Sequence, residues 1–199
     1  MTELVTLGDY KSYMQIVSSN EDEYLARLIP SVSQLVKNYC GRDFVDYFST
    51  DKTEVFDIEG STVRKIFLKE LPVLSVTSVK ERTSFSGSWT DLYDDGTNGS
   101  YDYYVEKPTG IITRVSDSAK ACWPEGVARV EVVYKGGYDT LPADLELGVF
   151  DIIKYYHKKE ATPRKTAQGT TKESTSTASK DGQASFPDHI TRILDLYKI

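Results

Sequence analysis

Apolar residues recur every three or four positions in both terminal parts of the chain and alternate with polar residues in its middle. Between residues 20 and 40 the apolar spacing matches one face of a helix with 3.6 residues per turn. Short helices are predicted over residues 4–17 and after Pro187, and a third helix is predicted from Leu141-Pro142 onwards. The apolar stripe of the 20–40 helix consists of Leu25, Leu28, Ile29, Val32, Leu35, Val36 and Tyr39.

Capping and breaking residues predict where these helices start and stop. Thr6 is suited to cap the first helix, and Asn20 the second, where a glutamate three residues on completes a capping box. Pro30 falls inside the second helix and predicts a kink, or a division of the helix, near residues 22–29. Gly41 suits the left-handed position that ends a helix, so Cys40-Gly41-Arg42 is interpreted as a C-cap and not as a reactive thiol.

From Phe44 to Tyr138 the period changes to the two-residue repeat of β-strands. Pro72–Lys80 and Val127–Tyr134 alternate clearly, and residues 101–105 and 110–115 read as a hairpin. Because no helix separates these strands, an antiparallel sheet fits better than a parallel one. The predicted fold class is therefore α+β: a small bundle of about four helices from both termini, with an inserted antiparallel β-sheet subdomain.

The predicted organisation is one compact domain with an insertion. Residues 1–43 form an N-terminal helical pair, residues 44–140 the β region, and residues 141–199 the C-terminal helices. A Ser/Thr-rich loop over residues 160–185 interrupts this last part, and its composition cannot bury enough apolar surface to fold alone. A connection of this length is either disordered or functional.

Charge and composition exclude several functional classes. The net charge is −6, but residues 1–153 hold 15 basic against 25 acidic residues, whereas residues 154–199 hold 9 against 5. An acidic body argues against dedicated DNA binding, although it suits a channel through which DNA slides. Solubility alone explains it equally well. No apolar run reaches the roughly 20 residues of a membrane span, and the first residues lack the features of a secretory signal.

The two cysteines and two histidines suggest no disulfide framework and no metal centre. Cys40 and Cys122 lie far apart and are expected to be reduced and partly buried. Neither has a partner at metal-ligand spacing, and His157 and His189 are isolated in the sequence, so a zinc site is not predicted.

One acidic segment invites a test as a calcium loop. Asp91, Asp95 and Asp102 fall at positions one, five and twelve of the EF-hand spacing. Position three is Tyr93, a poor ligand, and position twelve carries the shorter aspartate, so a polar hairpin loop is the preferred interpretation. No known catalytic motif is present, and neither enzyme activity nor a cofactor is predicted. A metal-dependent hydrolase acting through Asp91, Asp94 and Asp95 stays open as an alternative.

Aromatic residues suggest a second alternative. A cluster on the predicted strands is suited to a ligand-binding face, although tyrosines are also common on exposed sheets and at interfaces. The cluster comprises Trp89, Tyr93, Tyr101, Tyr103 and Tyr104.

Four short blocks in a fixed order point to a family. They are Tyr39-Cys40-Gly41-Arg42-Asp43-Phe44, the strand Leu71-Pro72-Val73-Leu74-Ser75-Val76-Thr77-Ser78-Val79-Lys80, the strand and turn Val130–Tyr138, and the helix start Leu141-Pro142-Ala143-Asp144-Leu145. This series resembles the head–tail connector (adaptor, or head-completion) proteins of long-tailed double-stranded DNA bacteriophages. The resemblance covers most of residues 4–159 and, more weakly, residues 186–199.

What the resemblance implies is a structural virion protein without chemistry of its own. It implies a homo-oligomeric ring, typically twelve-fold, that docks on the portal protein and joins the head to a stopper or tail-completion protein. Genome DNA would pass through the lumen without specific binding. The expected location is the virion neck, after assembly in the host cytoplasm, with no membrane involved. A virion or binding module that forms no ring and uses the tyrosine-rich sheet is the alternative.

Residues 160–199 are the predicted portal contact, because they combine a basic loop with an amphipathic terminal helix. The expected anchors are Ile193, Leu196 and Tyr197, and the expected charges are Arg164 and Lys165.

Overall fold

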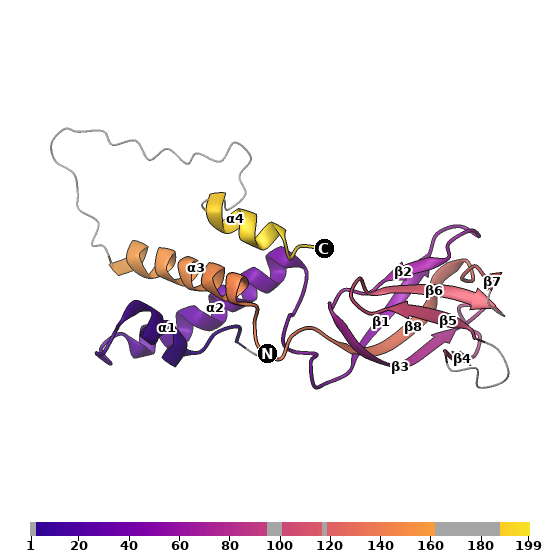
Figure 1. Ribbon diagram of the computed structural model, residues 1–199, viewed down its shortest axis with the longest axis horizontal. Helices are drawn as coiled ribbons and strands as arrows, with labels where there is room; N and C mark the ends of the chain where they lie inside the picture. The colour runs from indigo at the N-terminus through magenta and orange to yellow at the C-terminus, as the bar shows by residue number, and fades with distance from the viewer. Residues whose placement is uncertain (1–2, 95–100, 117–118, 162–187) are drawn as a thin grey trace. The chain divides into compact units, whose positions relative to one another are not determined.

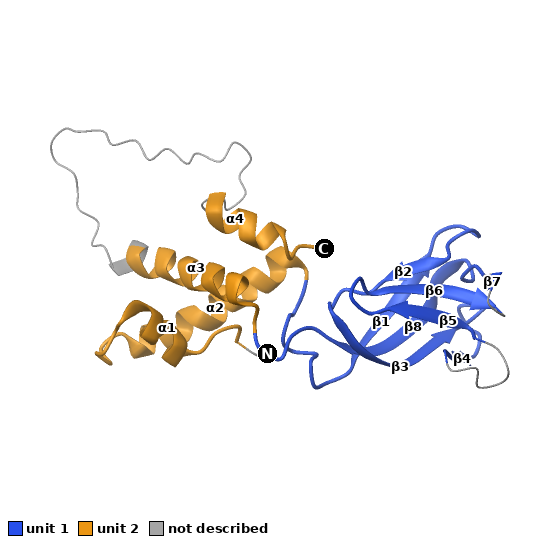
Figure 2. Ribbon diagram, viewed as in Figure 1, with its two compact units in different colours: residues 1–2, 42–140 blue, residues 3–41, 141–199 orange. Residues whose placement is uncertain are grey.

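A computed structural model describes residues 3–94, 101–116, 119–161 and 188–199. The chain separates into two compact units (Figure 2). We call residues 42–140 the β unit, and residues 3–41 together with 141–199 the helical unit. Helices from both chain ends and antiparallel strands from the middle confirm the predicted α+β class.

The helical unit is built around two long helices. Its elements are α1 (Leu7–Met14), α2 (Asp22–Cys40), α3 (Ala143–Ala161) and α4 (Asp188–Asp195) (Figure 1). The helix α2 contacts α1, α3 and α4, and α3 also contacts α4. Its core is formed by one apolar stripe from each helix: Tyr10, Leu25, Ile29, Val32, Val36, Leu145, Val149, Ile152, Ile153, Ile190 and Leu194 are all buried.

Two of the predicted helix boundaries are confirmed. The Thr6 hydroxyl accepts a hydrogen bond from the Asp9 backbone N–H at 3.1 Å, and the Asp9 carboxylate bonds back to the Thr6 N–H in a capping box. Gly41 ends α2 with φ 71°, where a Cβ would meet nothing within 4 Å. This position therefore requires glycine for its backbone conformation and not for lack of space.

One prediction about α2 is wrong, and another is wrong in one of its two alternatives. Its N-cap is Glu21, without a side-chain cap bond, and the N–H of Asn20 instead donates to the Ser18 hydroxyl. Pro30 does not divide the helix, which runs unbroken from Asp22 to Cys40, while the kink near residues 22–29 stays a prediction. Burial of the stripe on both sides of the proline offsets the one hydrogen bond that its ring removes.

The β unit contains two sheets where a single one was expected. Sheet A has the order β1-β8-β3-β4, and sheet B the order β2-β6-β5, with β7 paired to β6. Every pairing among the described strands is antiparallel, and β5 and β6 form the predicted hairpin. The strands are β1 (Lys52–Ile58), β2 (Lys65–Phe67), β3 (Val73–Glu81), β4 (Thr90–Leu92), β5 (Tyr103–Glu106), β6 (Ile111–Ser116), β7 (Ala119–Lys120) and β8 (Gly126–Gly136).

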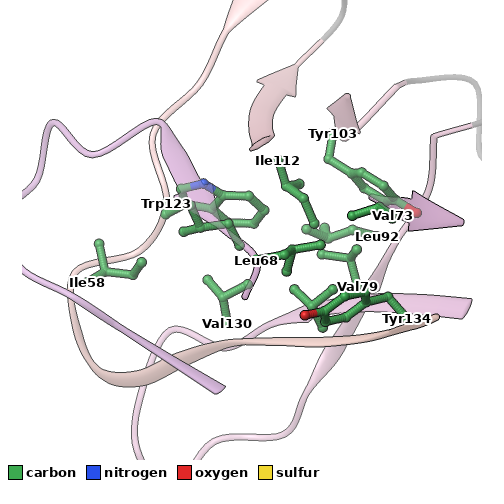
Figure 3. Close-up of a cluster of buried hydrophobic side chains, with 12 residues drawn as sticks. Ile58, Leu68, Val73, Val79, Leu92, Tyr103, Ile112, Trp123, Val130 and Tyr134 are labelled. Atoms are coloured by element: carbon green, nitrogen blue, oxygen red, sulfur yellow. The ribbon is translucent and has the colours of Figure 1, made fainter. Parts of the chain in front are cut away.

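One apolar core serves both sheets (Figure 3). Val79, Val130 and Val132 enter it from sheet A, Ile112 enters it from sheet B, and Trp123 lies among them with 1% of its surface exposed. Because alternate residues of each strand point inward, the remaining residues form an outer face. The strands therefore position a set of polar and aromatic side chains on the outside of the unit.

Candidate functional site

Parts of three of the four blocks that resemble the connector family meet at one place in the β unit. The Phe44 carbonyl accepts a hydrogen bond from the Tyr138 N–H at 2.8 Å, and the Pro72 carbonyl accepts one from the Gly137 N–H at 3.0 Å. The Arg42 guanidinium donates to the carbonyl of the residue before Pro72 and lies 5.2 Å from the centre of the Phe44 ring. We call this junction of residues 42–44, 70–72 and 136–138, with the Lys52, Glu54 and Tyr134 side chains, the clasp.

Gly137 is the tightest point of the clasp. Its φ of 94° is in the left-handed region, and a Cβ placed there would lie 2.0 Å from the Phe44 carbonyl oxygen. Phe44 itself has φ 64° and is fully buried. Space and backbone conformation both require glycine at position 137.

A buried carboxylate holds the clasp together. Glu70 is fully buried, and its carboxylate accepts the N–H groups of Asp43 at 3.0 Å and Phe44 at 3.2 Å. The Lys52 ammonium donates to the same carboxylate at 2.7 Å. The Glu70 N–H donates to the Tyr134 hydroxyl at 2.9 Å, and that hydroxyl donates to Glu54 at 2.7 Å. Glu70 thus connects residues 43–44, at the start of the β unit, to Tyr134 of β8, near its end.

Two groups in the clasp, Lys52 and Tyr134, have a raised pKa. Burial lowers the pKa of Lys52, but the hydrogen bond and charge of Glu70, with Asp43 and Glu54, outweigh it, so its pKa is raised above 10.5. Burial raises the pKa of Tyr134 strongly, and Glu54 adds to that rise against the opposing Glu70 N–H bond. A charged lysine and a neutral tyrosine with such partners cross-link the structure, and neither is a nucleophile at neutral pH.

A second polar node lies in the helical unit. Nδ1 of the buried His157 lies 3.2 Å from the Tyr10 hydroxyl, and Nε2 lies 3.2 Å from Glu21. Burial, and then the Glu21 charge, raises the pKa of Tyr10 to about 12. His157 therefore connects α3 to α1 and to the start of α2. The sequence places these residues so far apart that no local signal indicated the contact.

The acidic residues of the calcium hypothesis do not assemble in the described part of the chain. Asp102 accepts the Tyr93 N–H at 3.1 Å and lies 3.7 Å from Arg114, so it closes a loop. Asp91 is exposed on β4, and Asp95 lies outside the described residues. Among those that the structure describes, no three Asp, Glu, His or Cys residues are grouped to hold a metal ion.

The cysteines differ from each other in burial. Cys40 is fully buried and Cys122 is exposed, so the prediction that both are partly buried is wrong: the first is more buried than expected and the second less. Cys122 falls in the irregular segment between β7 and β8.

The three predicted portal anchors differ in what surrounds them. The Tyr197 hydroxyl donates to Asp144 of α3 at 2.7 Å, and Ile193 lies against Gly148 of α3. Leu196 is 76% exposed. Arg164 and Lys165 lie outside the described residues. Ile193 and Tyr197 thus hold the C-terminal segment on its own bundle, while Leu196 faces solvent.

The aromatic cluster is divided in the same way. Tyr103 is buried in the core, whereas Tyr104 and Tyr101 are mainly exposed. A hollow of about 320 Å³ opens beside β5. Its lining includes Tyr101, Tyr103, Tyr104, Val105 and Val115. The Trp89 ring makes a cation–π contact instead: the Arg82 guanidinium lies over it, 4.4 Å from the ring centre.

Comparison with known proteins places the whole chain in one family. The family described as "Head completion protein" matches residues 3–199. The head completion protein of Escherichia phage T5 is 22% identical over 197 residues, which cover 98% of each chain.

Similar solved structures come from the necks of gene transfer agent (GTA) particles. A chain from the neck of an empty particle, computed with C6 symmetry, has a TM-score of 0.58 at 14% identity and covers 98% of this chain and 89% of its own. One from the neck of a native particle, computed with C12 symmetry, has a TM-score of 0.55 at 13% identity and covers 99% and 93%. At such identities these structures show the shared fold. The match over residues 3–199 shows that the chain belongs to the head completion protein family, which confirms the connector family that its four sequence blocks indicated.

Proposed function

We propose that the head–tail connector role that follows from the family is carried out by a ring of identical subunits docked on the portal vertex of a virion head. The observation that carries this proposal is the family match across both units, from residue 3 to residue 199. The six- and twelve-fold symmetries belong to the necks of GTA particles, whose chains share this fold, and they support a ring here. Twelve subunits is the number that we propose.

The clasp supports a structural role. The Glu70 carboxylate is engaged by the Lys52 ammonium at 2.7 Å and by the Asp43 backbone N–H, contacts that cross-link the chain. No described helix combines the length and apolar character that crossing a bilayer requires. The ring would extend the DNA channel without binding DNA specifically, and its far side would receive a stopper or tail-completion protein.

Portal contact is assigned to the C-terminal segment. Leu196 and the terminal Ile199 are mainly exposed, while Ile193 and Tyr197 face α3 and fix the segment in place. Two exposed apolar side chains on a firmly held segment are suited to fill a pocket on a partner. Arg164 and Lys165 remain proposed contributors from the basic loop.

The test is cryo-electron microscopy of DNA-filled, tailless heads that carry the portal, mixed with this protein. Wild-type protein is expected to add a symmetric layer under the portal, and Leu196→Asp to remove it. Val17→Asp is the matched control, because Val17 is 98% exposed in the helical unit and has no assigned contact. Bare portals at saturating wild-type protein would overturn the proposed function, and the tyrosine-rich face would then be tested for ligand binding by the monomer.

A further inference from the structure

The two edges of sheet B differ in a complementary way. Phe67, at the end of the edge strand β2, is 62% exposed, while its neighbours Ile66 and Leu68 are buried. The register aligns Phe67 with Ile111 of β6 and Glu106 of β5. A phenylalanine that points outward from an edge strand exposes apolar area without any gain in packing. One edge of the sheet therefore carries an apolar protrusion.

The opposite edge carries a recess. The hollow of about 320 Å³ is lined by three tyrosines of β5 and of the segment before it, by two valines and by two charged residues: Tyr101, Tyr103, Tyr104, Val105, Val115, Asp94 and Lys107. A cavity of about 150 Å³ is enough to hold benzene, so this hollow has room for an aromatic side chain. Tyrosine rings provide the edges and faces with which another aromatic ring packs.

The β2 and β5 edges are also complementary in charge. Lys65 on β2 and Glu106 on β5 are both exposed, and neither forms an ion pair within the described residues. The register aligns Lys65 with Tyr104, and Phe67 with Glu106. Consider the β2 edge of one copy placed beside the β5 edge of another, with the strand directions and the register that β2 and β5 have within one sheet. Phe67 would then be diagonal to Tyr104, and Lys65 to Glu106. Diagonal positions are within reach of aromatic and long side chains.

We propose that neighbouring subunits of the ring meet at these edges, with Phe67 of one copy in the tyrosine-lined hollow of the next and Lys65 beside Glu106. This inference rests on the proposed ring. A closed ring needs two different surfaces on each subunit that fit each other, because each contact is head-to-tail. The β2 and β5 edges form such a pair in shape and in charge. The occupant of the hollow is thus a second copy of this chain.

Cross-linking on docked heads tests the contact directly. In a Cys122→Ser background, Lys65→Cys and Glu106→Cys are placed in one chain, bound to portal-bearing heads and treated with a short bismaleimide. A ladder of covalent multimers on a denaturing gel is expected. Chains with only one of the two cysteines should give no multimers, and a mixture of the two single variants should give dimers only.

Substitution of the protrusion gives an independent measurement. Phe67→Asp is expected to reduce the number of subunits per docked head at least tenfold. Phe85→Asp is the control, because Phe85 is 67% exposed in the connection between β3 and β4, two strands of sheet A. Lys65→Glu or Glu106→Lys alone should weaken occupancy, and the two together should restore it.

The outcomes separate the contact from the connector role. Normal occupancy by Phe67→Asp, or wild-type density under the portal without a ladder from the double-cysteine chain, would overturn the contact and leave the connector role standing. Absence of wild-type density would overturn the connector role, and the subunit contact with it.

Discussion

The β unit and the helical unit each have an apolar core, but they differ in the polar contacts that are added to it. In the β unit, buried charges join three separate segments, and Glu70 alone binds two backbone N–H groups and the Lys52 ammonium. In the helical unit, apolar stripes form the core, and polar pairs such as Tyr10–His157 lie among them. Three of the four blocks by which the family was recognised contribute residues to the clasp, where Gly137 has no room for a side chain. The surfaces proposed for partners instead consist of exposed apolar side chains.

Removing one charge from the clasp is expected to have the largest effect. Lys52→Met keeps the length of the side chain but leaves Glu70 with an uncompensated buried charge, which should cost about 3–5 kcal/mol of unfolding free energy. Both tryptophans, Trp89 and Trp123, belong to the β unit, so fluorescence during urea unfolding reports on it. Ellipticity at 222 nm reports mainly on the helices. We expect the fluorescence transition to shift much further than the ellipticity transition.

The control for this change is Arg27→Met, which removes one partner of the exposed Arg27–Glu23 pair on α2. Such a surface pair contributes little, so neither transition should move measurably. If Lys52→Met shifted the fluorescence and ellipticity transitions equally, the clasp would stabilise the whole chain, and the two units would not be stabilised separately.

Truncating a core side chain of the helical unit should shift the ellipticity transition and not the fluorescence transition. Leu194 of α4 is fully buried, and Leu194→Ala should cost about 2–5 kcal/mol through lost burial and the cavity left behind. The ellipticity transition is expected to shift, and the fluorescence transition to stay in place. An unchanged ellipticity transition would mean that α4 does not pack on its own bundle in solution.

Alkali should weaken both units, with a smaller effect and different causes. The pKa of Lys52 and that of Tyr134 are raised in the β unit, and that of Tyr10 is raised to about 12 in the helical unit. Each group holds its proton more tightly when folded, so its contribution is fully present below the unfolded pKa of about 10 and is lost as pH rises through the folded pKa. Unfolding free energies measured from pH 9 to 12 should therefore fall. Tyr10→Phe should flatten the fall for ellipticity only.

Periodicity and capping predicted the local structure of the chain well. The stripe of α2, the Thr6 cap, Gly41 and the β5–β6 hairpin depend on residues close in sequence, and all of them are confirmed. Asn20 does not cap α2: it lies in a turn in which the Asp22 N–H donates to the Ser19 carbonyl at 3.2 Å, and the Asn20 N–H donates to the Ser18 hydroxyl.

The polar contacts escaped prediction because they are long-range. Glu70 reaches residues 26 and 27 positions away, and Tyr10 reaches a histidine 147 positions away. A charged residue beside a strand is normally exposed, so nothing in the local pattern marked Glu70 or Lys52 as buried. The division into two sheets had the same cause, since strand pairing joins distant segments. The Phe67 protrusion was visible only once the register was known.

Substitution of Leu196 is expected to affect stability very little and docking on the portal strongly. Leu196 faces solvent, so Leu196→Asp should leave both unfolding transitions within about 0.5 kcal/mol of wild type. Ile193→Asp would place a charge against Gly148 of α3 and should destabilise the helical unit as well as abolish docking. Measured together by urea unfolding and by density under the portal, the two variants distinguish lost contact from lost fold. Docking that survives Leu196→Asp but not Ile193→Asp would show that the portal requires the folded bundle and not this side chain.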